Sequence, residues 1–438
     1  MSSIFRNWNF NLLLSGRFLA NMGDSFYAIA AMWMVYQLGG STLYTGLALF
    51  LTSLPALAQI VLGPLIDRFP AKRLMIFTQL TQALLLLIIP ALYAYQLLTI
   101  AVVLTLMPII SLLNQFIYPT QLSLLPKVLP KEQLTRGNSL FAIAYQGSDA
   151  AFNSLAGIVI AMIGAVSVFY LNSMTFVLTA LLFTLLRLPQ AEQKQKAQQA
   201  ENHEDALAAP ENEQTVAERP TLKTVFRQYM SDLREGLDVL KKPVFTRMLL
   251  GIIFVNLAGV SIYAVLPAFG ESWGGPQYYG FFMAAAGVGI VTGSYAASML
   301  KLYRFKMGLL YCLLIFICGL CWMFTGLVPS AWMAIALFAI GWIPAGMINV
   351  LSQVMIQSIV PPQLIGRVMA AVIGLSAAIA PLGAILGGAL GAWAGNSVLI
   401  ISCGVIVVLN SAYWLLNKHT RAMPPAKDMT PAVLGLAE

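Results

Sequence analysis

Two carboxylic acids, Asp24 and Asp149, lie well inside long apolar stretches of this 438-residue chain. Acidic groups are costly in hydrocarbon, and those found there usually serve a function. Removal from water favours the neutral form of a carboxyl group, so each acid could take up and release a proton. We predict proton coupling at both residues, with structural hydrogen bonding between helices as the alternative. The two histidines, His203 and His419, lie outside the apolar stretches and are not candidates.

A basic residue shares the helix face of the first acid. Arg17, Asn21 and Asp24 follow one another at steps of four and three residues, the spacing that places side chains on one face of a helix. Arg17 could neutralise an acid within its reach, or it could extend its charged group to the membrane surface. The sequence leaves both roles open.

The elements that must position these residues are membrane-spanning helices. Hydrophobic residues make up 59% of the chain and charged residues only 10%, whereas soluble proteins carry about 25% charged residues. A spanning helix needs about 20 apolar residues. Runs of that length fall at roughly 11–38, 43–66, 74–94, 98–123, 139–163, 166–187, 245–270, 276–300, 308–328, 331–358, 367–393 and 397–417. We therefore expect an all-α membrane protein with twelve transmembrane helices.

A polar insert divides these helices into two groups of six. The predicted domains are an N-terminal six-helix bundle (1–187), a cytoplasmic linker (188–243), a C-terminal six-helix bundle (244–418) and a cytoplasmic tail (419–438). Within the linker, apolar residues recur every three or four positions over about 221–242, which indicates an amphipathic helix. It lies on the membrane surface or packs against the bundle.

The distribution of basic residues predicts the orientation. Alternate loops, near 39–42, 95–97, 164–166, 270–276, 329–330 and 394–396, contain no Lys or Arg. Basic residues gather in cytoplasmic loops of membrane proteins, so we expect both termini in the cytoplasm of a multi-pass protein of the plasma or inner membrane. The net charge of +8 then reflects anchoring beside anionic lipid rather than binding of nucleic acid.

The two halves repeat each other at a fixed offset. Arg136 and Arg367 stand at the start of the fifth and eleventh predicted helices and are 231 residues apart. Arg73 and Arg304, after the second and eighth helices, keep the same spacing. Internal repeats of this kind build secondary transporters, with a binding site between the halves near the middle of the bilayer.

The loop after the second helix carries a family resemblance. It reads Gly63-Pro-Leu-Ile-Asp67-Arg68-Phe-Pro-Ala-Lys72-Arg73. This resembles the signature between helices 2 and 3 of the major facilitator superfamily, in which a glycine, an Asp-Arg pair and a basic pair recur. The match departs from that pattern at Pro70, where a glycine is usual, and at Ala71, where a basic residue is usual.

Two further segments narrow the resemblance to one branch of the superfamily. They are Leu129-Pro-Lys-Glu-Gln-Leu-Thr-Arg-Gly-Asn-Ser139 and Asp232-Leu-Arg-Glu-Gly-Leu-Asp-Val-Leu-Lys-Lys-Pro243. Both look like the branch that holds macrolide-efflux proteins and the enterobactin exporter. The basic, glycine-rich pattern that proton-coupled drug antiporters often carry in helix 4 is missing, because helix 4 contains no Arg.

The resemblance implies a conformational latch between the halves. Asp67 would face the start of the eleventh helix and pair with Arg367, stabilising an outward-open state. The residues assigned to this latch are Gly63, Asp67, Arg68, Lys72, Arg73, Arg136 and Arg367. The alternative is an ordinary loop whose charges face water.

The resemblance also implies that helices 1, 4, 7 and 10 line a central cavity, and polar or aromatic stripes follow these helices. The predicted lining residues, with two neighbours of Asp149, are Arg17, Asn21, Asn114, Tyr118, Gln121, Tyr145, Phe152, Asn256, Tyr263, Trp342, Asn349 and Gln353. Each residue alone is equally suited to holding helices together. A cavity of amides and aromatic rings with few charges suits a bulky, partly apolar, neutral or cationic solute.

We therefore expect a secondary exporter that works by alternating access and proton exchange. A lysolipid or lipid flippase, a solute importer and a non-transporting membrane sensor remain alternatives. The sequence offers no catalytic cluster, no metal-binding pattern and no phosphate-binding loop, so we expect neither an enzyme nor a cofactor. The expected partners are a small-molecule substrate, protons and the lipid bilayer, with no nucleic acid, for a chain acting as a monomer.

Overall fold

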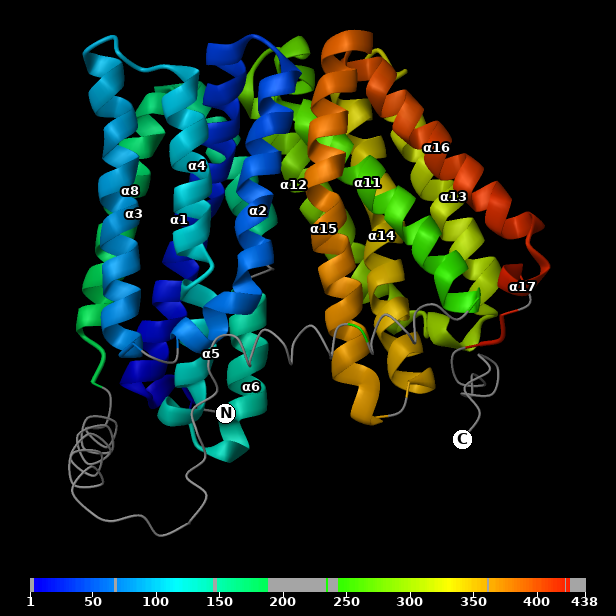
Figure 1. The fold of residues 1–438 in the computed structure, drawn as a ribbon, viewed down its shortest axis with the longest axis horizontal. Helices are drawn as coiled ribbons and strands as arrows, with labels where there is room; N and C mark the ends of the chain where they lie inside the picture. Colours follow the sequence, from blue (N-terminus) through cyan, green and yellow to red (C-terminus); the bar gives the residue numbers. More distant parts are fainter. Residues whose placement is uncertain are drawn as a thin grey trace, which may run out of the picture.

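The computed structural model describes residues 4–66, 69–144, 148–187, 234, 243–360, 362–421 and 423–425. Every secondary-structure element within these residues is a helix, as Figure 1 shows. Asp67, Arg68 and Tyr145 lie outside the described residues. So does the predicted amphipathic helix at 221–242, apart from residue 234.

The N-terminal half, residues 4–187, begins with a short 3-10 helix and continues with eight α-helices. Their bounds are η1 (Ile4–Arg6), α1 (Trp8–Gly39), α2 (Thr42–Ile66), α3 (Ala71–Ala94), α4 (Ile100–Asn114), α5 (Ile117–Val128), α6 (Lys131–Ala142), α7 (Asp149–Ile163) and α8 (Ala165–Thr184). Of these, α3 packs along α8, and α1 packs against both α7 and α8.

The C-terminal half, residues 243–425, contains longer helices. They are α11 (Pro243–Ser272), α12 (Pro276–Met299), η3 (Leu302–Arg304), α13 (Met307–Thr325), α14 (Ala331–Ile359), α15 (Pro362–Ala394), α16 (Asn396–Leu416) and α17 (Lys418–Arg421). Here α12 packs against α14, and α13 packs against α16.

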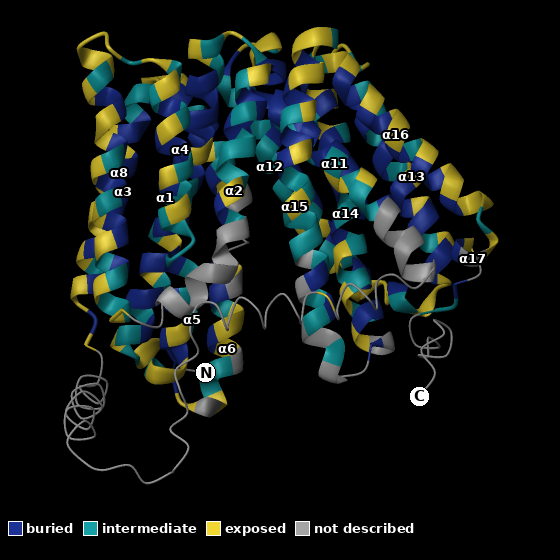
Figure 2. Ribbon diagram, in the orientation of Figure 1, coloured by how far each residue is buried: buried dark blue, intermediate teal, exposed yellow. Residues whose placement is uncertain are grey.

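Within the described residues, nine helical segments are long and apolar enough to cross a membrane, and two shorter apolar helices accompany them. The nine include Ile100–Val128 counted as one segment. Large apolar side chains such as Leu84, Leu181 and Leu409 point outward on these helices, as lipid contact requires. Figure 2 shows exposed residues along the outer sides of the bundle and buried residues between helices. That twelve helices cross the membrane stays a prediction.

One expected continuous helix is interrupted. The segment predicted at 98–123 divides into α4 and α5 at Gln115 and Phe116. Pro119 lies in the first turn of α5, where its missing N–H cannot bond to the carbonyl group four residues earlier, that of Gln115. The chain therefore stops one helix and starts another at this point. The apolar run crosses the break and does not reveal it.

Two pairs of helices join the halves, α2 with α15 and α7 with α12. Glycines permit close approach at both. A Cβ atom on Gly46 would lie 2.7 Å from Cα of Gly388, and one on Gly157 would lie 2.7 Å from Cα of Gly280. Thr42 Oγ1 adds a hydrogen bond of 3.0 Å to the carbonyl oxygen of Gly388. Small residues thus let the helix backbones touch where the halves meet.

The predicted offset of 231 residues recurs in the structure. Gly164 and Gly395 are spaced by this amount, and each forms the single-residue turn between two helices, α7–α8 and α15–α16. Their φ angles are 80° and 94°, a region that favours glycine. Gly157 and Gly388, the interface glycines of α7 and α15, also differ by 231. The turns and the joining contacts of the halves are therefore equivalent.

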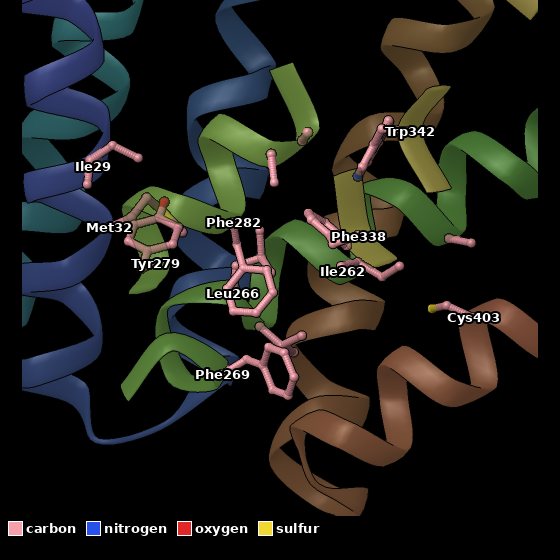
Figure 3. Close-up of a cluster of buried hydrophobic side chains, with 14 of the residues drawn as sticks. Ile29, Met32, Ile262, Leu266, Phe269, Tyr279, Phe282, Phe338, Trp342 and Cys403 are labelled. Atoms are coloured by element: carbon pink, nitrogen blue, oxygen red, sulfur yellow. The ribbon is translucent and has the colours of Figure 1, made fainter. Parts of the chain in front are cut away.

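Side chains of both halves share one buried core. Figure 3 shows Ile29 and Met32 of α1 beside Tyr279 of α12. We call the end of the molecule that holds Gly40, Gly164 and Gly395 the glycine-turn end, and the opposite end, which holds α17, the α17 end. The glycine contacts between the halves lie toward the glycine-turn end, near the start of α2 and α12 and the end of α7 and α15.

Candidate functional site

The centre of the candidate site in the N-terminal half is the guanidinium group of Arg17. Only 1% of this residue is exposed, which excludes extension of its charge to the membrane surface. The guanidinium carbon lies 5.3 Å from the centre of the Tyr118 ring, within the range of a cation–π interaction. Its Nη2 group donates a hydrogen bond to Oδ1 of Asn21. The charge is therefore held inside the bundle by α1 and α5.

Asn21 connects this cation to a second change of helix geometry. Its Nδ2 group donates to the carbonyl oxygen of Ala144 at 2.7 Å and lies 3.4 Å from Oγ of Ser148. Ile143 and Ala144 follow α6 in the wider π conformation, which recurs at functional sites. A buried carbonyl group needs a donor, and Asn21 supplies one. Its amide is thus committed to holding the backbone as well as Arg17.

Asp24 lies one turn beyond Asn21 on α1 and is partly exposed. The structure therefore places Arg17, Asn21 and Asp24 along one helix, as the spacing predicted. Asp149 is the first residue of α7 and directly follows Ser148, to which Asn21 reaches. The surroundings of the Asp149 side chain lie outside what the structure describes. The roles of both acids in proton coupling stay predictions.

Other predicted residues of the N-terminal half occupy different surroundings. Gln121 is completely buried, and within the described residues neither of its amide atoms has a hydrogen-bond partner. Phe152 is buried and packs edge-on against Phe18 of α1 at a ring distance of 4.9 Å. Asn114 and Tyr118 are partly exposed. Gln121 is the clearest unfilled polar group near α1, because buried amides normally have partners.

The C-terminal half contributes an aromatic group. The rings of Tyr263 on α11 and Trp342 on α14 stack with centres 5.3 Å apart. Two further rings pack against Trp342, that of Trp322 at 5.1 Å and that of Phe338 at 6.1 Å. Figure 3 shows Phe338 and Trp342 together on α14. The sequence paired none of these rings, and it missed Trp322 and Phe338 because both lie in uniformly apolar runs.

The remaining predicted lining residues of this half are exposed. They are Asn256 on α11 and Asn349 and Gln353 on α14. Asn349 and Gln353 are four residues apart and so share one face of α14. The structure does not join them to the stack formed by Tyr263 and Trp342.

The latch residues are only partly within the described part of the chain. Lys72 Nζ donates to the carbonyl oxygens of Thr184 and Leu186, at 2.7 and 2.8 Å, so it ties α3 to the end of α8 in its own half. Arg73 and Arg136 are exposed, and Arg367 is partly buried. Gly63 lies in α2. The pairing of Asp67 with Arg367 stays a prediction, since Asp67 lies outside the described residues.

A profile of the Major Facilitator Superfamily matches residues 13–382. The chain belongs to this superfamily. It is 27% identical over 435 residues to YfiS, an uncharacterized transporter of Bacillus subtilis, covering 95% of this chain and 94% of that one. It is also 21% identical over 413 residues to the multidrug efflux pump Tap of Mycolicibacterium fortuitum, covering 91% of this chain and 93% of the pump.

Solved structures of superfamily members have the same fold. A bacterial homologue of the human lysosomal transporter Spinster, in an inward-facing and unoccupied conformation, superimposes with a TM-score of 0.66 at 14% identity, covering 96% of this chain and 98% of that one. The nucleoside transporter NupG gives 0.68 at 13% identity, with 93% and 98% covered. This superfamily member is therefore a multi-pass membrane transporter in fold and family, and its relatives are transporters rather than enzymes.

Proposed function

We propose that this chain is a proton-coupled exporter of an amphipathic small molecule, working by alternating access in the plasma or inner membrane. One observation carries the proposal: a buried cation held on a tyrosine ring, Arg17 on Tyr118, lies on the same helix face as the acid Asp24. A charge in the membrane is costly, so its retention favours a role in moving charge or substrate. Similarity to the multidrug pump Tap supports export.

The halves supply different contacts to the substrate in this proposal. The N-terminal half offers Arg17, Tyr118 and Asp24, which suit polar groups and protons. The C-terminal half offers the stack of Tyr263 on Trp342, which suits planar or apolar groups. A substrate with both a polar and an apolar part would contact both halves at once. Alternating access then passes it across the membrane as the halves rock about their glycine contacts.

The test is flux in proteoliposomes that carry a pH gradient. The wild-type chain should move a fluorescent amphipathic cation only while the gradient is present. Asp24→Asn and Asp149→Asn should each abolish gradient-driven flux and leave binding of the dye intact. Glu132→Gln, an exposed acid at the start of α6, is the matched control and should transport normally. Full gradient-driven flux in both aspartate variants would refute proton coupling at these acids.

A further inference from the structure

The last described residues of the chain fold back over the start of α13. The carbonyl oxygen of Pro424 accepts a hydrogen bond of 3.4 Å from the backbone N–H of Met307. Gly308 faces the carbonyl oxygen of Thr420 so closely that a Cβ atom there would collide with it. Met423 is buried. Figure 1 shows α17 beside the lower end of α13. Two segments far apart in sequence, 300–307 and 416–425, therefore lie against each other.

This contact gathers positive charge on one small surface. Five exposed basic residues belong to the two segments: Lys301, Arg304, Lys306, Lys418 and Arg421. Among the described residues of the C-terminal half, the only carboxylate is Glu271, at the turn between α11 and α12. That turn lies at the glycine-turn end. No described acid of this half therefore offsets the charge at the α17 end.

Apolar side chains stand among these cations. Phe305 is 57% exposed, Leu300 is 60% exposed and Leu416 is 82% exposed. A soluble polyanion would cover the charges and leave these side chains in water. A phospholipid covers both, because its phosphate meets the cations while its glycerol and acyl region meets the apolar groups. The surface is amphipathic in the way that membrane-interface sites are.

We propose that this surface, which we call the basic clasp (residues 300–306 and 416–421), binds an anionic phospholipid. The lipid phosphate pairs with the Lys306 and Arg421 side chains, whose backbones are brought together by the contact of Gly308 with Thr420. Arg suits phosphate through its paired N–H donors. Occupancy of the clasp ties the end of α16 to the start of α13, so anionic lipid stabilises the C-terminal half.

The test uses the full-length chain purified in detergent, with phosphatidylglycerol or phosphatidylcholine added. Bound lipid is measured by native mass spectrometry, and unfolding is followed by temperature. The test variant is Lys306→Gln with Arg421→Gln. The matched control is Arg6→Gln with Arg187→Gln, which removes two exposed cations from the N-terminal half. We expect the test variant to lose about tenfold in affinity for phosphatidylglycerol and to lose its thermal protection, while the control keeps both.

Three outcomes would overturn the proposal. Equal losses in the test and control variants would show a general effect of surface charge. Unchanged affinity in the test variant would show that the clasp does not hold the lipid. Protection by inorganic phosphate as strong as that by phosphatidylglycerol would show a site for soluble anions. A second variant, Lys306→Arg with Arg421→Lys, keeps the charges; it should retain lipid binding, which separates loss of the site from loss of the fold.

Discussion

The two halves of the molecule share their packing and differ in their chemistry. Both use a lone glycine as the turn before their last long helix, Gly164 and Gly395, at the offset of 231 residues. At the same offset, the acids Asp24 and Asp149 correspond to Val255 and Ala380. In the other direction, Trp342 corresponds to Ser111. The equivalent positions that hold the fold are kept, and those that hold charge or rings are not.

The difference extends to the helices themselves. In the N-terminal half, α4 and α5 are separate helices and the backbone widens after α6, with Arg17 and Asn21 of α1 beside both places. In the C-terminal half, α14 and α15 run unbroken through the corresponding positions. Interruptions free backbone groups that polar side chains must satisfy. The half that carries the buried cation is therefore also the half with the irregular backbone, and the aromatic half is regular.

The largest effect should follow removal of the buried cation. Arg17→Ala deletes the charge on Tyr118 and the hydrogen bond to Asn21, so flux in proteoliposomes should fall about tenfold or more, because charge-assisted contacts in a dry site are strong. Arg17→Lys keeps the charge but loses the planar group that stacks on the ring, and should retain part of the flux. Normal flux in Arg17→Ala would remove the charged site from the comparison.

The next effect tests whether the glycine contacts are equivalent. Gly157→Leu and Gly388→Leu each insert a side chain where the partner backbone leaves no room. Overpacking of this kind costs roughly 1–3 kcal/mol, and both variants should unfold at lower temperature by similar amounts. Gly164→Leu, at a turn where a Cβ atom would have no neighbouring atom within 4 Å, controls for strain at a glycine of positive φ. A large effect in only one interface variant would break the structural equivalence of the halves.

The sequence predicted the regular parts of this comparison better than the irregular ones. Apolar runs located the helices, and the repeat at Arg136 and Arg367 anticipated the turns at Gly164 and Gly395. The break between α4 and α5 was missed, although Pro119 marks it, because hydropathy does not register a missing N–H group. The placement of Arg17 on Tyr118 depends on the rotation of two helices about their axes, which a single sequence does not fix.

A similar limit applies to the roles of individual polar residues. Asn21 was expected to face a substrate, and the structure commits its amide to Arg17 and to the carbonyl group of Ala144. Lys72 was assigned to a latch between the halves by resemblance, and its ammonium group bonds to carbonyl oxygens at the end of α8. Residue type shows that a group needs partners, and only the packed helices show which partners it has.

The smallest effect should follow a change within the aromatic group. Trp342→Phe keeps a ring against Tyr263 but removes the indole N–H and part of the stacked area. An aromatic pair contributes about 0.5–1.5 kcal/mol beyond its buried area, so the apparent KM for a planar substrate should rise by a factor of about 2 to 10, with kcat little changed. An aliphatic substrate of similar size should be transported with nearly the wild-type KM.

The control for this change is another buried tryptophan in the same half. Trp414 on α16 packs against Tyr311 and Gly251, away from α14, and within the described residues its Nε1 atom, like that of Trp342, has no hydrogen-bond partner. Trp414→Phe should lower the unfolding temperature without changing KM, because it alters packing and not the stack on Tyr263. If both variants shifted KM alike, the aromatic group would act only through the stability of the C-terminal half, and substrate contact would be left to the N-terminal half.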